Sequence, residues 1–365
     1  MKNNIINSFK SFLILLLIVA GASCQKLQET PEGIAVPSNF YGTIAQCEAA
    51  YAGSMNTLYS TWNAYQNGVS FPDGQYEGAD LDFSVGSFNE VWTWHYKAIS
   101  NVNAVLKAVK AGSLAGNSTE AIANIVAQGR FLRAYNYFNL VRLYGKIPYI
   151  TEDTPDPVST PLTAASRLEI AAVYDLIEAD LLDASTNLGD YDGAAAMKPN
   201  KWMAKGFLAK VYLTRATAPL NQTENYAKAR DMADDVITNG PYALLPKFED
   251  VFKTSNNRNM EIMFAFTVSS DAPYMPGNVW APSEMDGWSS GPVKILWATT
   301  IYPEQPRKHS YILLDFTSDI YDPSARVINW SESADGVPYI GKLNMPNLTY
   351  DQQVSGGDAG IEMKL

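Results

Sequence analysis

The sequence predicts a mostly α-helical protein, built as a scaffold of repeated helical hairpins that is followed by a loop-rich, partly β region. Two observations support this fold class. Apolar residues recur at three- and four-residue spacing over much of the chain up to about residue 240. Beyond that point, Gly and Pro interrupt the apolar runs, and the strand-like segment EIMFAFTV, residues 261–268, lies among them.

Composition limits the functions that this chain can have. The 365 residues are 47% hydrophobic and 18% charged, which is typical of a folded protein with a full core. The formal net charge is -11, and the sequence contains no run of basic residues. Because phosphate binding needs clustered Lys and Arg, we expect no nucleic-acid partner.

The N-terminal residues predict export. Lys2 and Lys10 precede the apolar run FLILLLIVA, and the small residues GASC follow it and end at Cys24. This pattern is typical of a lipoprotein signal peptide over residues 1–23, with Cys24 acylated and anchoring the mature protein to a membrane surface. A plain signal peptide cleaved near Ser23 is the alternative. The polar, proline-bearing residues 24–39 are then a tether.

Two amphipathic helices are expected after the tether. The first covers QCEAAYAGSMNTLYSTW, residues 46–62, and a loop rich in Gly and Asp, Asn67–Phe88, follows it. The second is VWTWHYKAISNVNAVLKAV, residues 91–109, which ends near Gly112.

The segment GRFLRAYNYFNLVRLYGKIPYI, Gly129–Ile150, predicts a helix covered by neighbours on several sides, because it is apolar nearly all round. Gly145 ends this helix, and Pro148 makes the exit extended. On a helical wheel Arg142 lies inside the apolar face, so its guanidinium needs a carboxylate or several carbonyls there. Asp180, at the edge of the apolar stripe of a later helix, is the candidate partner for Arg142 or for Arg130.

Three further helices complete the predicted scaffold, over residues 165–188, 198–218 and 223–240. The inward positions of the first of these are Ile170, Val173, Ile177, Leu181, Ala184 and Leu188. The other two helices form a hairpin with a short loop. Successive hairpins of this kind are similar to tetratricopeptide-type repeats, although the repeat is structural and does not by itself predict peptide binding.

Aromatic residues after the scaffold predict carbohydrate binding. Four of them stand among Pro and Gly in YMPGNVWAPSEMDGWSSGPVKILW and are therefore expected on loops: Tyr274, Trp280, Trp288 and Trp297. Flat aromatic rings stack on the apolar C–H faces of sugars. The alternative is that a given ring packs onto the scaffold, and we expect at least one tryptophan to be exposed and at least one to pack inward.

No pattern in the sequence predicts catalysis. The chain has two histidines, His95 and His309, and no HExxH, GxSxG, GxxxxGK or calcium-loop motif. We therefore expect a protein that is not an enzyme and that needs no metal or cofactor. A glycosidase needs only two carboxylates, so a secreted glycoside hydrolase is the less favoured alternative.

Five segments, in order, resemble the SusD/RagB family of outer-membrane glycan-binding lipoproteins. They are GRFLRAYNYFNLVRLYGKIPYI, AAVYDLIEADLLDA, AKGFLAKVYL, NYAKARDMADDVI and NRNMEIMFAF, and the resemblance covers the chain from the signal peptide to about Leu343. It implies a cell-surface protein of Gram-negative bacteria that binds oligosaccharide and acts as a lid on a TonB-dependent transporter of the SusC type. A peptide-binding lid of a peptide importer is the alternative within the same resemblance.

The resemblance also places the binding residues and the domain. It favours the aromatic region 274–297, and it adds four candidates from the first helices and the loop before them: Tyr76, Asn89, Trp92 and Trp94. Trp92 and Trp94 start a helix, so packing into the core is the stronger expectation for them. Residues 40–365 are expected to form a single SusD-like domain, with the scaffold over about 40–240 and the binding region over about 241–350. Members of this family normally continue with further C-terminal helices that this sequence lacks.

Overall fold

The computed structural model describes residues 40–55, 86–155, 166–193, 198–251, 256, 259–267 and 362–364, together with most of 282–340. Nearly all of these residues belong to one compact unit, Tyr41–Leu365. The predicted signal peptide, tether and Cys24 lie outside the described residues. No helix in the described part of the chain combines the length and the apolar character that crossing a membrane requires.

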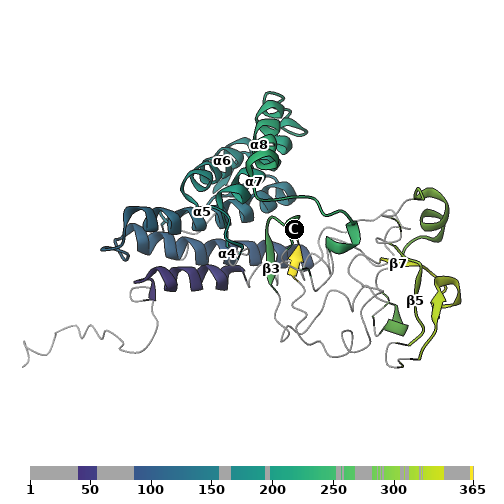
Figure 1. Ribbon diagram of the computed structural model, residues 1–365. Coiled ribbons are helices and arrows are strands. Elements are labelled where there is room, and N and C mark those ends of the chain that lie inside the picture. The colour runs from purple at the N-terminus through teal and green to yellow at the C-terminus, as the bar shows by residue number, and fades with distance from the viewer. Residues whose placement is uncertain are drawn as a thin grey trace, which may run out of the picture. The chain divides into compact units, whose positions relative to one another are not determined.

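Long helices make up the first part of the described chain, as the sequence predicts (Figure 1). A helix over 44–55 is followed by a series of labelled helices: α4 (Gly86–Lys110), α5 (Thr119–Tyr144), α6 (Ile170–Asn187), α7 (Lys201–Ala216) and α8 (Asn225–Asn239). From α4 to α8, each helix packs against the next one in the chain. Consecutive packing of this kind confirms the tetratricopeptide-like scaffold. The predicted loop Asn67–Phe88 is too long at its end, because Gly86–Phe88 already belong to α4.

The central helix α5 is defined by its caps and covered along most of its length. The Ser118 side chain accepts a hydrogen bond from the Ala121 amide at the N-terminal end. Gly145 ends the helix with a φ of 70°, a left-handed conformation that favours glycine. Every residue from Phe131 to Phe138 is buried. The prediction of a helix sandwiched by its neighbours is therefore confirmed.

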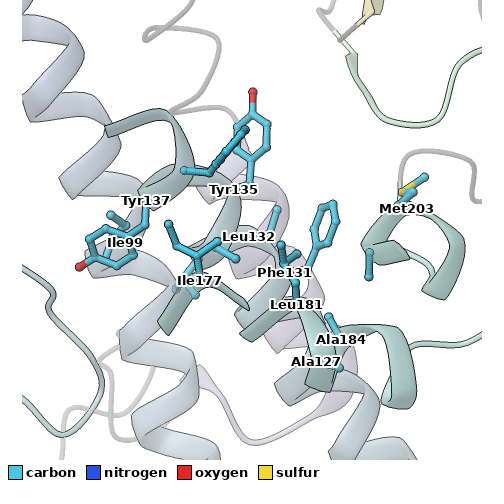
Figure 2. Packing of buried hydrophobic residues seen from close by; sticks show 14 of the residues in the cluster. Ile99, Ala127, Phe131, Leu132, Tyr135, Tyr137, Ile177, Leu181, Ala184 and Met203 are labelled. Atoms are coloured by element: carbon cyan, nitrogen blue, oxygen red, sulfur yellow. The ribbon is translucent and has the colours of Figure 1, made fainter. Parts of the chain in front are cut away.

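The main hydrophobic core lies between the helices, and Figure 2 shows residues of α5 and α6 meeting within it. Val173, Ile177, Leu181 and Ala184 of α6 are fully buried, as their spacing predicts. Phe131 of α5 meets the Phe207 ring of α7 edge-on, with 5.5 Å between the ring centroids, and the Phe264 ring at 5.2 Å. Phe264 therefore fastens the chain just before β3 onto the helical scaffold.

One glycine allows two helices to approach closely. A Cβ atom built on Gly129 would lie 2.4 Å from the Tyr51 hydroxyl oxygen and 2.9 Å from Leu106 Cδ2. The Tyr51 hydroxyl donates a hydrogen bond to the Ile125 carbonyl at 3.0 Å. The helix over 44–55 is thus held against α5 at a distance that only glycine at position 129 permits.

Short antiparallel strand pairs make up the β structure. Within the scaffold, β1 (Ile147–Pro148) pairs with β2 (Arg167–Leu168), so the extended exit predicted at Pro148 is confirmed. In the later region the pairs are β3 (Ala265–Thr267) with β8 (Glu362–Lys364), β4 (Ile312–Leu313) with β7 (Tyr339–Ile340), and β5 (Asp315–Thr317) with β6 (Val327–Asn329). A second, small core of Leu313, Phe316, Ile328 and Tyr339 supports the β4–β7 and β5–β6 pairs. The later region is therefore partly β, as predicted.

Candidate functional site

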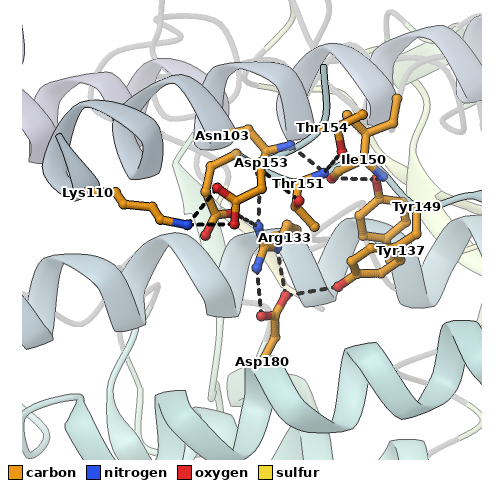
Figure 3. A network of polar contacts seen from close by, with 11 residues as sticks. Asn103, Lys110, Arg133, Tyr137, Tyr149, Ile150, Thr151, Asp153, Thr154 and Asp180 are labelled. Carbon is orange, nitrogen blue, oxygen red and sulfur yellow. Dashed lines mark hydrogen bonds and ion pairs between the residues drawn. The ribbon is translucent and has the colours of Figure 1, made fainter. Parts of the chain in front are cut away.

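A buried arginine joins three elements of the scaffold (Figure 3). Arg133 of α5 donates two hydrogen bonds to the Asp180 carboxylate of α6, from Nε to Oδ2 and from Nη2 to Oδ1, each 2.8 Å long. Its Nη1 also donates to Asn103 Oδ1 of α4 at 3.1 Å and to a Glu152 carboxylate oxygen at 2.5 Å. The Arg133 and Asp180 side chains are only 6% and 9% exposed. The two-pronged geometry and the second carboxylate satisfy a cation that burial would otherwise destabilise.

The predicted pairing of Arg142 with Asp180 is wrong, because Arg133 occupies that carboxylate. Arg142 is exposed in the last turn of α5, where its Nε donates to the Phe138 carbonyl at 3.2 Å and its guanidinium lies 4.3 Å from the Phe138 ring centroid. Arg130, the other candidate, pairs with Asp183 at 2.7 Å. The wheel misplaced the ion pair because neighbouring helices cover the middle of α5 but leave Leu143, beside Arg142, 38% exposed.

The ionisable groups of the scaffold are held in structural roles. His95 of α4 is buried, and its Nδ1 lies 2.8 Å from Asn136 Oδ1 of α5. Burial lowers the pKa of His95 to about 4, so the imidazole is neutral at physiological pH. Burial raises the pKa of Glu152, but the adjacent Arg133 guanidinium outweighs it, and the pKa lies below its ordinary value. Among the described residues, no group of three or more His, Cys, Asp or Glu side chains could hold a metal ion.

Two of the aromatic candidates on α4 already contact other protein groups. Trp92 is half-buried against the main core, with its ring 4.7 Å from Tyr96 and 5.0 Å, edge-on, from Tyr144. Trp94 is half-buried, and the Lys97 ammonium lies 4.6 Å from its ring centroid. Asn89 is exposed, and its backbone carbonyl accepts a hydrogen bond from the Thr93 hydroxyl. The sequence favoured packing into the core for Trp92, and its ring does pack against the main core.

Trp297 is the aromatic candidate from the later region that the structure describes. It begins a short helical turn, Trp297–Ile301, and is half-buried, with its ring edge-on to Tyr302 at 4.8 Å between centroids. Ile295, Leu296 and Ile301 flank it and are 43%, 64% and 60% exposed. We call residues 295–302 the Trp297 surface. The candidates Tyr76, Tyr274, Trp280 and Trp288 lie outside the described residues.

A scaffold of stacked helical hairpins, followed by a region that presents a half-buried aromatic ring among exposed apolar side chains, is typical of binding proteins built on repeats. The chain belongs to the SusD-like family. A family model described as "Starch-binding associating with outer membrane" matches residues 25–213. A SusD-like protein from Bacteroides ovatus is 31% identical over 272 residues, which cover 68% of this chain and 47% of that protein.

Further comparisons agree with the family and the fold. SusD-like protein P2 from Formosa agariphila is 29% identical over 271 residues, which cover 69% of this chain and 50% of that protein. The chain therefore spans about half the length of these curated relatives. A SusD homolog from Bacteroides thetaiotaomicron superposes with a TM-score of 0.59 at 16% identity, over 90% of this chain and 67% of that one.

The descriptions of two solved structures with similar folds name a carbohydrate ligand. One, described as a complex with xylogluco-oligosaccharide, has a TM-score of 0.67 at 22% identity, over 87% of this chain and 66% of that one. The other, a laminarin-binding SusD-like protein, has a TM-score of 0.56 at 20% identity, over 87% of this chain and 76% of that one. Both similarities show the fold.

Proposed function

We propose that this protein captures oligosaccharide at the cell surface and passes it to a TonB-dependent outer-membrane transporter of the SusC type. The match to a starch-binding, outer-membrane-associating family carries the proposal. Structural neighbours that bind laminarin and xylogluco-oligosaccharide support the class of ligand. The protein performs no catalytic step on the glycan and needs no cofactor.

The Trp297 surface provides the kind of contact that a sugar ring needs. An indole ring that is partly exposed offers a flat apolar area, and the exposed Ile295 and Leu296 beside it extend that area. Burying the C–H face of a pyranose against such a surface is favourable because apolar area leaves water on both sides. The ring of Tyr302 meets Trp297 edge-on and thereby limits the orientations that the indole can adopt.

Lipidation of Cys24 is the proposed means of attachment. Acyl chains on this residue would hold the protein at the outer face of the outer membrane, with residues 24–39 as a tether. A lid on a transporter has to remain close to it while moving, and the polar, proline-bearing composition of residues 24–39 suits such a tether.

Affinity electrophoresis tests the proposed function. The protein is run in native gels that contain laminarin, xyloglucan, pullulan, galactomannan, dextran, alginate or polygalacturonate, and a gel without polysaccharide is the reference. Retardation in at least one gel is the expected result. A pull-down with a library of immobilised peptides runs in parallel. Binding to peptides with no retardation by any polysaccharide would contradict the proposal and favour a peptide importer's lid.

A further inference from the structure

Two cations of the helical scaffold have no acidic partner among the described residues. Helices α5, α7 and α8 contain three, four and two lysines or arginines, nine in all. Seven of them form ion pairs with carboxylates: Arg130, Arg133, Lys201, Lys205, Arg215, Lys228 and Arg230. The other two, Arg142 and Lys210, are exposed, and neither pairs with a described carboxylate. They are therefore the cations of these helices that remain available to an anion.

Lys210 lies level with the last turns of α5. Ion pairs from α5 meet residues of α6 in reverse order, and the start of α7 is hydrogen-bonded just beyond the end of α6, so α5 and α7 run in the same direction. The Tyr135 ring of α5 meets the Phe207 ring of α7 edge-on, with 5.4 Å between the ring centroids. One turn further along both helices, Asn139 of α5 and Lys210 of α7 therefore lie at the same level.

The Arg142 guanidinium reaches back to this level. Its Nη2 donates a hydrogen bond to Asn139 Oδ1 at 2.5 Å, and the guanidinium lies 4.3 Å from the Phe138 ring centroid. Partial burial of the Lys210 side chain and the nearby positive charge of Arg142 both lower the pKa of Lys210. Two like charges therefore stand close together on α5 and α7, and an anion between them would relieve their repulsion.

Tyr174 of α6 adds a neutral donor to the two cations. Its ring meets the Phe138 ring edge-on, with 6.2 Å between the ring centroids, and the Arg142 guanidinium lies against that same Phe138 ring. Tyr174 is 4% exposed, and its hydroxyl makes no hydrogen bond with the described residues. Burial raises the pKa of Tyr174, although the charges of Arg142 and Arg215 act against it, so the hydroxyl keeps its proton.

We propose that the Arg142 guanidinium, the Lys210 ammonium and the Tyr174 hydroxyl form a binding site for an oxyanion. A carboxylate or a phosphate fits, because all three side chains donate hydrogen bonds and none is bonded to a described carboxylate. Nε and Nη2 of Arg142 are used within α5, which leaves Nη1 to donate to the anion. The oxyanion comes either from solution, as free phosphate, or from an acidic side chain of a polypeptide. The site does not depend on the proposed glycan contact at the Trp297 surface.

Two probes distinguish these sources. The protein is unfolded with urea in sodium phosphate or with an oligoglutamate peptide, and each is compared with NaCl at the same ionic strength. A ligand that binds only the folded state raises the urea midpoint, and the dependence on its concentration gives the dissociation constant. We expect at least one probe to raise the midpoint beyond the effect of NaCl. Tighter binding of oligoglutamate assigns the site to a polypeptide carboxylate, and tighter binding of phosphate assigns it to a free anion.

Single substitutions locate the binding and remove general effects of salt. Arg142→Gln and Lys210→Gln should each weaken the affinity about tenfold or more, and Tyr174→Phe should weaken it less, because a neutral donor contributes less than a charged one. Lys107→Gln is the control and should bind as the parent does, since Lys107 is exposed on α4 without an ion-pair partner among the described residues. The inference is overturned if neither probe exceeds NaCl, or if the Arg142→Gln and Lys210→Gln proteins respond as strongly as the control.

Discussion

Arg133 and Asp180 form a two-pronged ion pair in the core of the helical scaffold, with both hydrogen bonds 2.8 Å long. The pair fixes α5 against α6, and the additional bonds of Arg133 to Asn103 and Glu152 bring α4 and the exit of α5 into contact with it. Tyr149 adds a further hydrogen bond from its hydroxyl to Asp180 Oδ2 at 3.0 Å. We call these five residues the Arg133 cluster.

Arg133→Ala should lower the free energy of unfolding by about 3–5 kcal/mol, because it leaves the buried Asp180 carboxylate and the partly buried Glu152 carboxylate without their cation. Arg142→Ala is the matched control, since the same residue type on the same helix is exposed there, and we expect a change within about 1 kcal/mol. Urea denaturation followed by circular dichroism measures both. Equal losses from the two substitutions would contradict the assignment of Arg133 as the structural arginine.

Gly129→Ala should destabilise the protein although alanine is the better helix former. The new methyl group would meet the Tyr51 hydroxyl oxygen at 2.4 Å, and a ring is a stiffer neighbour than a flexible chain. Gly53→Ala is the control, because nothing lies within 4 Å of its added Cβ, and a gain of up to about 1 kcal/mol is expected there.

The close approach can be tested further by a double-mutant cycle. Tyr51→Phe removes the hydroxyl oxygen that a Cβ at position 129 would meet first. Combining it with Gly129→Ala should therefore cost less than the sum of the two single substitutions. Strictly additive losses would show that Tyr51 is not the obstacle.

The buried His95 makes stability depend on pH. Its pKa is about 4 in the folded state and 6.5 when unfolded, so the unfolded chain binds more protons between these values. The contribution of His95 is complete above about pH 6.5 and is lost as the pH falls toward 4, by roughly 3 kcal/mol in all.

His95→Asn tests this dependence, because the asparagine amide can replace the contact of the imidazole Nδ1 with Asn136. The variant is expected to be less stable at pH 7 but to show a flatter slope between pH 6.5 and 4.5. Guanidinium denaturation at a series of pH values gives the slope, and a slope equal to that of the unmodified protein would contradict the prediction.

Trp297→Ala should weaken binding of the best polysaccharide about tenfold or more, since a stacking contact contributes roughly 1–3 kcal/mol. Tyr226→Ala, which removes an aromatic ring that is 47% exposed on α8, is the control and should bind as the parent does. Isothermal titration measures both affinities. Full binding by Trp297→Ala would move the search to Tyr274, Trp280 and Trp288, and to the group of Tyr76, Asn89, Trp92 and Trp94.

Cys24→Ala should release the protein from the membrane fraction, because the acyl chains have no other cysteine near the predicted cleavage site. Fractionation of outer membranes followed by immunoblotting measures the distribution. A variant that still sediments with the outer membrane would show that the anchor lies elsewhere.

Local patterns predicted the helices, although α5 begins at Thr119, ten residues before the stretch in which the sequence placed it. The spacing in α6 identified its buried positions, and Gly145 and Pro148 marked the end of α5, because caps and periodicity depend on residues that are near in sequence. For the later region, the sequence predicted that strands occur, but it did not predict which strands pair. Its strands are two or three residues long, and the partner of β3 is β8, far away in sequence.

Contacts between segments far apart in the sequence decide the features that the sequence did not predict. Three arginines are set into the apolar α5, and which of them is buried depends on where α4 and α6 cross it, which no wheel of α5 alone contains. The burial of Trp92 on α4 also depends on another helix, because its ring packs against Tyr144, the last residue of α5. The aromatic candidates of the later region were expected on loops, and this is wrong for Trp297, which begins a short helical turn.

The Arg133 cluster also imposes an order on synthesis. Its acceptors lie 30 residues before the arginine, at Asn103, and 19 and 47 residues after it, at Glu152 and Asp180. A nascent chain that ends before residue 180 therefore holds a cation whose main counterion does not yet exist, and α5 cannot settle into an apolar environment on its own. The buried position of Arg133 in α5 is therefore complete only once α6 has been synthesised.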